Sequence, residues 1–204
     1  MFVKICGITR AEDAEAAVEQ GANAVGFIFW PDSPRFIEPS RAHGIITTLP
    51  PSVMAVGVFV NQPAEHVNYV ASAARLGAVQ LHGDEDEKYA ASIAVPVIKV
   101  LTAEGAAQSW PDEVLLLIDA SDPVRRGGTG KTADWSAAAA LARRRRVLLA
   151  GGLTPHNIAE AVAQVRPFGV DVSSGVERSP GVKDRQRLTA LFEAIKGAVV
   201  RENR

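Results

Sequence analysis

Short apolar stretches recur along the chain, each rich in Val, Ile, Leu or Phe and separated from the next by a more polar segment. Most of them end in glycine or a polar residue, as a buried strand does where it opens into a loop. Eight such stretches are present, at residues 2–6, 24–29, 54–60, 78–83, 97–101, 114–120, 147–152 and 170–175. The pattern therefore predicts eight strands.

The segments between these stretches carry the apolar spacing and the punctuation of helices. Thr9 and Glu12 have the spacing of a capping box, in which the two side chains bond the free N–H groups of a first helical turn. They precede the Ala- and Glu-rich segment 11–20. Gly21 follows that segment and suits the left-handed residue that often ends a helix. We expect a helix over 11–20.

Three other segments show similar signals. Thr154 with Pro155 places a cap residue before a proline, which is favoured at the first helical position. Asn61 and Pro63 are expected to begin another helix in the same way, and 184–200 is amphipathic.

Regular alternation of strands and helices predicts a parallel sheet, and eight repeats favour a closed (β/α)₈ TIM barrel. About 200 residues is the lower end for this fold, so we expect a compact barrel and one domain over 1–204. The fifth connection, 102–112, contains Gly105 and Pro111, which predicts a short or irregular fifth helix. A doubly wound open sheet is the alternative, but its glycine fingerprint after the first strand is missing.

Composition narrows the function classes. The net charge is −1, and the main basic run, 143–146, falls where a helix would end, so we expect no nucleic-acid partner. Cys6 is the single cysteine, which favours a reducing compartment. We see no signal peptide and no apolar run long enough to cross a bilayer, and we therefore expect a cytoplasmic protein with no membrane partner.

The stretch GGTGKT, at 127–132, suggests a nucleotide-binding P-loop at first sight. That motif requires a glycine five residues before Gly130, and the chain has Arg125 there. The P-loop interpretation therefore fails at its first position.

The catalytic face of a (β/α)₈ barrel lies at the carboxyl ends of its strands. The candidate site residues are those that end a predicted strand or follow it directly: Cys6, His82, Asp119, Gly151, Gly152, Asp171, Ser173, Ser174 and Gly175. Loops after the seventh and eighth strands frequently bind phosphate in this fold, and glycine lets a backbone approach an anion closely. We therefore expect a phosphate site among the six candidates from Gly151 to Gly175. The alternative is that these glycines only allow tight turns.

Cys6 and Asp119 are the candidate base and acid. A thiol is mostly protonated at neutral pH and needs help to act as a base. An acid role for Asp119 would need a carboxyl that stays protonated, which burial favours. The alternatives are a small core side chain for Cys6 and a cap or loop hydrogen bond for Asp119.

Lys4 lies two residues before Cys6 and should point to the same face. A buried lysine needs an acidic partner, and Asp171 is one candidate. Arg35 lies in the loop after the second strand, where a guanidinium suits a carboxylate. His82 could be an acid, a hydrogen-bond donor or a structural residue.

Several motifs together resemble those of the phosphoribosylanthranilate isomerase family. They run in order along almost the whole chain: KICGIT (4–9), VGFIF (25–29), SPR (33–35), VGVFVN (56–61), VQLHG (79–83), LLID (116–119), GGTGKTADW (127–135), LAGGLTPHN (149–157) and VDVSSGVERSPGVKD (170–184). Ala133 departs from the pattern, because the family often has Phe there. The resemblance assigns GGTGKT to the loop after the sixth strand.

The resemblance implies an Amadori rearrangement of N-(5-phosphoribosyl)anthranilate, without metal or other cofactor. Asp119 is similar to the acid that protonates the ribose ring oxygen, and Cys6 to the base that removes the C2 proton. The product is 1-(2-carboxyphenylamino)-1-deoxyribulose 5-phosphate, and the pathway is tryptophan biosynthesis.

The same resemblance implies the binding roles. Arg35 is similar to the group that holds the anthranilate carboxylate, and Asp171 to a carboxylate that faces the substrate. His82 matches the motif without a firm role. The phosphate cradle would comprise Gly151, Gly152, Ser173, Ser174 and Gly175. The implied partner is a small phosphosugar, and the sequence leaves a monomer and a homodimer both open.

Other phosphosugar enzymes of this fold are the rivals. The histidine-pathway aminoketose isomerase would have an aspartate in place of Cys6. An indole-glycerol-phosphate synthase would use strand lysines, for which Lys4 and Lys99 are available, but it lacks the KICGIT start. A phosphosugar-binding module without activity would be expected to lose Cys6 or Asp119.

Overall fold

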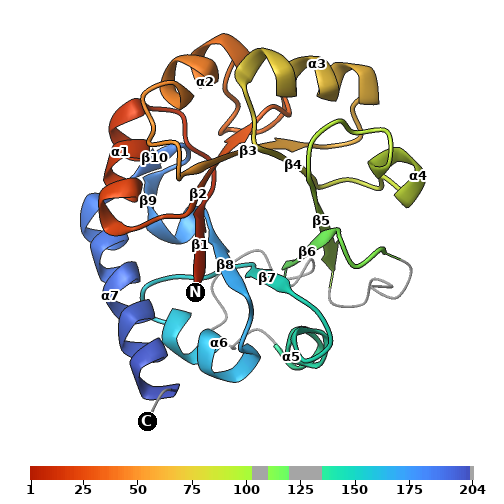
Figure 1. Ribbon diagram of the computed structural model, residues 1–204. Coiled ribbons are helices and arrows are strands. Elements are labelled where there is room, and N and C mark those ends of the chain that lie inside the picture. Colours follow the sequence, from red (N-terminus) through yellow and green to blue (C-terminus); the bar gives the residue numbers. More distant parts are fainter. Residues whose placement is uncertain (103–109, 120–134, 203–204) are drawn as a thin grey trace.

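The eight predicted strands form a closed parallel barrel in the computed structural model of the chain, which describes residues 1–102, 110–119 and 135–202. Neighbours in the ring follow the chain order, and β1 pairs with β8 to close it (Figure 1). The strands are β1 Phe2–Ile5, β2 Ala24–Ile28, β3 Met54–Phe59, β4 Ala78–Leu81, β5 Val97–Thr102, β6 Leu115–Asp119, β7 Val147–Ala150 and β8 Gly169–Val172. The (β/α)₈ prediction is confirmed, and the open-sheet alternative is wrong.

Helices surround the ring on its outer side (Figure 1). They are α1 Ala11–Gln20, α2 Pro39–Ile46, α3 Ala64–Ala74, α4 Glu87–Ala90, α5 Ser136–Ala142, α6 Ile158–Val165 and α7 Arg185–Glu202. After β8 come a 3₁₀ turn, Ser174–Val176, and a small hairpin of β9 Glu177–Ser179 and β10 Val182–Lys183. Within the described ranges, none of the helices is both long and apolar enough to cross a membrane.

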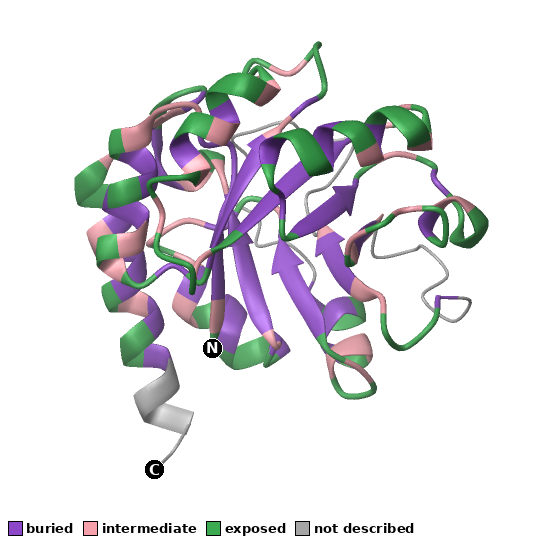
Figure 2. Ribbon diagram, turned by 45° about the horizontal axis from the view of Figure 1, so that its top comes forward, coloured by how far each residue is buried: buried purple, intermediate pink, exposed green. Residues whose placement is uncertain are grey.

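Burial follows this architecture. The strands are buried along most of their length, whereas each long helix shows bands of buried and exposed residues (Figure 2). A large core lies between strands and helices, and a smaller cluster fills the barrel interior. The interior cluster comprises Ala24, Val56, Ala78, Ile98, Val100, Leu117, Leu148 and Ala150.

The helix signals were right about α1 and α7 and wrong about the amino-terminal cap of α1. Gly21 ends α1 in the left-handed region, with φ 108°, as predicted. The Thr9–Glu12 capping box is wrong, because the Thr9 hydroxyl donates instead to the carbonyl of Gly181, at 2.5 Å. A partner distant in the chain has displaced the local cap. At α7, the Asp184 side chain accepts the N–H groups of two following residues at 2.9 and 3.1 Å.

The predicted starts of α3 and α6 also differ from the structure. Pro63 directly precedes α3, but the Asn61 side chain accepts the N–H of Asp84 and joins two loops. Helix α6 begins at Ile158, later than predicted, but Thr154 still caps the turn before it: its hydroxyl accepts the N–H of His156 at 3.3 Å and its carbonyl accepts the N–H of Ile158 at 3.0 Å. The predicted fifth helix falls largely on residues 103–109, outside the described residues, and stays a prediction.

Lys99 lies on a barrel strand, but its side chain points away from the barrel interior. Its neighbours Ile98 and Val100 face the barrel interior, so Lys99 faces the other way. Its ammonium donates to the Glu85 carboxylate at 2.9 Å and to the Gly83 carbonyl at 2.6 Å. A strand lysine held in this way does not fit a Schiff-base role in the barrel centre.

The Glu85–Lys99 ion pair predicts a specific acid sensitivity. Burial alone would raise the pKa of Glu85, but the hydrogen bond from Lys99 and two backbone N–H groups lower it below 4.5. The pair therefore stabilises the fold above about pH 4.5, and the contribution is lost as the pH falls through the lowered pKa. Glu85→Gln should cost about 1–3 kcal/mol of unfolding free energy at neutral pH.

Denaturant unfolding of the wild type and of Glu85→Gln, from neutral to acidic pH, measures this difference in unfolding free energy. The difference between wild type and Glu85→Gln should shrink on acidification, whereas the exposed Glu193→Gln control should change little at any pH. A difference that stays constant as the pH falls would contradict the prediction.

Candidate active site

A cavity of about 290 Å³ lies at the carboxyl ends of the strands. All ten predicted site residues line it: Cys6, Arg35, His82, Asp119, Gly151, Gly152, Asp171, Ser173, Ser174 and Gly175. Parallel strands bring their carboxyl ends to one edge, so these ten residues converge there from six different parts of the chain. The cavity also includes Gln80 and the apolar side chains of Ile28, Val58, Leu117, Ala150 and Leu153.

Strand register fixes the inward direction of several polar groups. Lys4 pairs with Asp171 across the β1–β8 seam, and their side chains meet at 2.9 Å. Both are buried, as the sequence suggested for a structural ion pair. Burial alone would lower the pKa of Lys4, but Asp171 and Cys6 raise it, so the lysine stays charged.

Cys6 follows β1 directly and is 5% exposed. Its N–H donates to the carbonyl of Val172 at 2.8 Å, which fixes the end of β1 against β8. Burial raises the pKa of the thiol, while the neighbouring Lys4 opposes that rise. Burial alone therefore disfavours the thiolate that a base requires. Nearby cations, among them Lys4, offset part of this effect.

Asp119 is the last residue of β6 and is in register with Thr102 of β5 and Ala150 of β7. Leu117, two residues earlier, belongs to the interior cluster, so Asp119 shares its inward face. The side chain is half-buried and lines the cavity. Cys6 and Asp119 thus approach the same space from strands that are not neighbours in the ring.

His82 and Gln80 come from β4 and its end. Burial lowers the pKa of His82, and the nearby Asp119 opposes this, so the imidazole is mostly neutral at pH 7. Gln80 lies 3.4 Å from His82 Nδ1 and is almost fully buried. Gln80 was not among the predicted site residues, although its position two residues before His82 places it on the same strand face.

Arg35 reaches the cavity because its loop folds back along β2. Ile28 and Phe36 form a parallel bridge, and the Ile37 N–H donates to the Ile28 carbonyl at 3.0 Å. The guanidinium makes a forked ion pair with Glu177, with Nε 2.9 Å from Oε1 and Nη2 2.7 Å from Oε2. Sequence reasoning found Arg35 but not this carboxylate, because the pair joins residues 142 positions apart.

The loops after β7 and β8 form one wall of the cavity. Gly151 and Gly152 have φ values of 92° and 61°, which L side chains rarely adopt. A Cβ atom at Gly175 would lie 1.8 Å from the carbonyl oxygen of Leu153, so only glycine allows the two loops to touch. Successive glycines in such loops leave backbone N–H groups open to an anion.

Metal and loop predictions can be compared with only part of the chain. Within 1–102, 110–119 and 135–202, no three His, Cys, Asp or Glu side chains are grouped to hold a metal ion. GGTGKT and Ala133 lie outside the described residues, so their assigned place after β6 stays a prediction.

Known proteins match this chain along nearly its whole length. A sequence profile of the family described as "N-(5'phosphoribosyl)anthranilate (PRA) isomerase" matches residues 3–194. N-(5'-phosphoribosyl)anthranilate isomerase of Trichlorobacter lovleyi is 50% identical over 97% of this chain and 98% of its own. The enzyme of the same name from Geobacter metallireducens is 48% identical over 95% and 98%.

Solved structures agree with these relatives. Phosphoribosyl anthranilate isomerase from Thermotoga maritima superposes with a TM-score of 0.90 at 45% identity, covering 97% of this chain and 99% of that one. A structure of such an enzyme in complex with reduced 1-(o-carboxyphenylamino)-1-deoxyribulose 5-phosphate has a TM-score of 0.83 at 41% identity, with the same coverage.

Gly175 offers a test of the predicted phosphate site in the loops after β7 and β8. Gly175→Ala should force the loops after β7 and β8 apart, which raises KM for the phosphosugar about 10- to 100-fold. Inorganic phosphate should also inhibit the variant more weakly. Steady-state kinetics with phosphate as inhibitor measures both effects.

Gly44→Ala is the matched control. Gly44 lies within α2, and a Cβ there meets nothing within 4 Å, so alanine should leave KM unchanged and stabilise the helix slightly. An unchanged KM in Gly175→Ala would separate these loops from phosphate binding.

Proposed function

The chain belongs to the N-(5'-phosphoribosyl)anthranilate isomerase family, and from this premise we propose how its own residues carry out the reaction. It is an isomerase of tryptophan biosynthesis. The observation that carries the residue assignment is one cavity in which Cys6 and Asp119 lie together with a glycine-rich wall.

Asp119 acts as the general acid. It donates a proton to the ribose ring oxygen, the bond from that oxygen to C1 breaks, and the nitrogen lone pair forms an iminium at C1. Its position at the end of β6, on the inward face, supports contact with a sugar ring in the cavity. A positioned acid contributes about 10²- to 10⁴-fold to such a step.

Cys6 then acts as the base. The iminium makes the C2 proton acidic, the thiolate removes it, and the electron pair forms the C1–C2 double bond of an enolamine. Loss of the 2-hydroxyl proton and protonation of C1 give the ketone, so the net change is an isomerisation. Lys4 and the other nearby cations support the thiolate that this step requires.

The remaining residues bind the substrate. The loops that contain Gly151, Gly152, Ser174 and Gly175 hold the phosphate, which is remote from the reacting carbons and orients them. Arg35 holds the anthranilate carboxylate with the part of its guanidinium that Glu177 leaves available. Neutral His82 can donate one N–H to a sugar hydroxyl or to Asp119.

A homodimer is the assembly we propose. The support is indirect: one solved relative, 40% identical, is presented as monomers generated from the dimeric phosphoribosylantranilate isomerase of Thermotoga maritima. The sedimentation of this chain at micromolar concentration tests it.

The acid and base assignments predict large losses of turnover. Asp119→Asn and Cys6→Ala should each lower kcat by about 10²- to 10⁴-fold while the fold is retained. The assay follows the fluorescence of phosphoribosylanthranilate, generated in situ, with no metal added. Circular dichroism checks the fold, and near-normal turnover in either variant would remove that residue from the mechanism.

Arg35 should behave differently, because its proposed partner does not react. Arg35→Ala should raise KM about 10- to 100-fold, as the loss of a charge-assisted hydrogen bond predicts, with a much smaller change in kcat. A loss confined to kcat, with KM unchanged, would contradict a role in carboxylate binding.

A further inference from the structure

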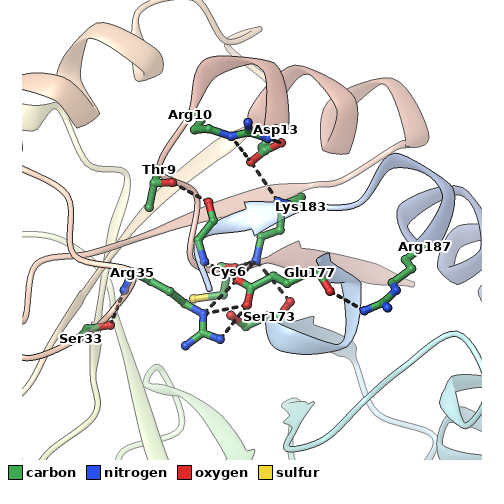
Figure 3. A network of polar contacts seen from close by, with 11 residues as sticks. Cys6, Thr9, Arg10, Asp13, Ser33, Arg35, Ser173, Glu177, Lys183 and Arg187 are labelled. Atoms are coloured by element: carbon green, nitrogen blue, oxygen red, sulfur yellow. Dashed lines mark hydrogen bonds and ion pairs between the residues drawn. The ribbon is translucent and has the colours of Figure 1, made fainter. Parts of the chain in front are cut away.

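A second buried ion pair lies beside the cavity, and the reaction as described does not use it. Glu177 and Lys183 come from the small β9–β10 hairpin, and their side chains meet at 2.8 Å. The Lys183 side chain is fully buried. Figure 3 shows Glu177 between the Arg35 guanidinium and the Lys183 ammonium, with Cys6 and Ser173 next to them.

Lys183 has the contacts of a protonated amine. Its ammonium donates to the Cys6 carbonyl at 2.5 Å, to the Ser173 carbonyl at 3.2 Å and to the Glu177 carboxylate. Three acceptors match the three N–H groups of an ammonium, whereas a neutral amine has only two. Burial lowers the pKa of Lys183 and Glu177 opposes this, and the three acceptors favour the charged form.

These contacts join three parts of the site. The Cys6 carbonyl belongs to the residue that carries the base, and the Ser173 carbonyl lies in the proposed phosphate wall. Glu177 in turn fixes Arg35, and its own main-chain carbonyl accepts a hydrogen bond from Arg187 of α7. The second strand of the hairpin is held as well, because the Lys183 main-chain N–H donates to the Asp13 carboxylate at 3.0 Å.

The charges around Cys6 do not balance when the thiol is neutral. The side chains that face it or its immediate partners are Lys4 from β1, Asp171 from β8, Arg35 from the loop after β2, Glu177 from β9 and Lys183 from β10, with His82 and Asp119 across the cavity. Lys4 is matched by Asp171, but Arg35 and Lys183 share the single carboxylate of Glu177. Of these five nearest charges, three are positive and two are negative.

We propose that Lys183 is a positioning residue for the Cys6 base, which it serves by holding the Cys6 main chain and by supplying the positive charge that the thiolate neutralises. The proposal rests on the base role of Cys6 given above. Glu177 has the opposite electrostatic effect, because it adds negative charge near the thiolate while it orients Arg35. The two members of one ion pair should therefore shift the ionisation of Cys6 in opposite directions.

Direct titration of the thiol tests this without any turnover. Cys6 is the single cysteine, so the thiolate ultraviolet absorbance and the rate of alkylation against pH both report on it alone. Lys183→Met should raise the apparent pKa of the thiol by about one unit, and Glu177→Gln should lower it. The base limb of the kcat/KM profile should move in the same directions.

The Glu85–Lys99 pair provides matched controls. Lys99→Met and Glu85→Gln remove the same two charges from another buried pair, which joins β5 to the loop after β4. They should destabilise the fold to a similar extent and leave the titration of Cys6 unchanged. Glu177→Gln preserves side-chain size, so it remains informative if Lys183→Met does not fold.

The outcomes distinguish a failure of the role proposed for Lys183 from a failure of the base role proposed for Cys6. The proposal is supported if Lys183→Met and Glu177→Gln shift the thiol pKa in opposite directions while the two control variants leave it unchanged. Shifts in the same direction, or no shift in Lys183→Met, overturn it. If the shifts are as expected but Cys6→Ala retains turnover, the electrostatic role of Lys183 stands and the base assignment falls.

Discussion

The closure of the ring between β1 and β8 is the constraint on which the rest of this structure depends. The seam brings Lys4 against Asp171 inside the barrel, where neither charge could be buried alone. It also places the end of β1, with Cys6, against the end of β8. The proposed base, the proposed phosphate wall and the β9–β10 hairpin are therefore neighbours as a consequence of how the sheet closes.

A division of labour follows from strand alternation. Side chains on the inner face of the barrel lie in or beside the cavity. Lys99 lies between two inward-facing residues of β5, so it points to the outer face, where it pairs with Glu85. Two buried Glu–Lys pairs thus have similar chemistry in different places. The Glu177–Lys183 pair lies next to Cys6, whose ionisation we propose that it shifts, and the Glu85–Lys99 pair holds the loop after β4 against β5.

The sequence alone was sufficient for features that depend on periodicity or on a local backbone requirement. Eight apolar stretches predicted the eight strands, and Gly21 predicted the end of α1. The two-residue spacing of Lys4 and Cys6 predicted that both side chains point to the same face. The cavity residues followed from the rule that strand ends converge. Asp171 was a candidate partner for Lys4 because a buried lysine needs a carboxylate, but other partnerships across the fold were not accessible: Thr9 bonds Gly181 instead of its own helix, and Arg35 pairs with Glu177. Such pairs depend on distances that no local pattern contains.

The seam has a further consequence for how this chain is made. Lys4 and Asp171 are 167 positions apart, and translation adds roughly 5–20 residues per second. The amino-terminal strand would therefore lack its second neighbour for roughly 10–30 s after it is synthesised. During that time an unpaired strand edge and an uncompensated lysine are both exposed, and such edges pair readily with other chains. The pairing that closes the barrel thus has to wait for the last of the eight barrel strands to leave the ribosome.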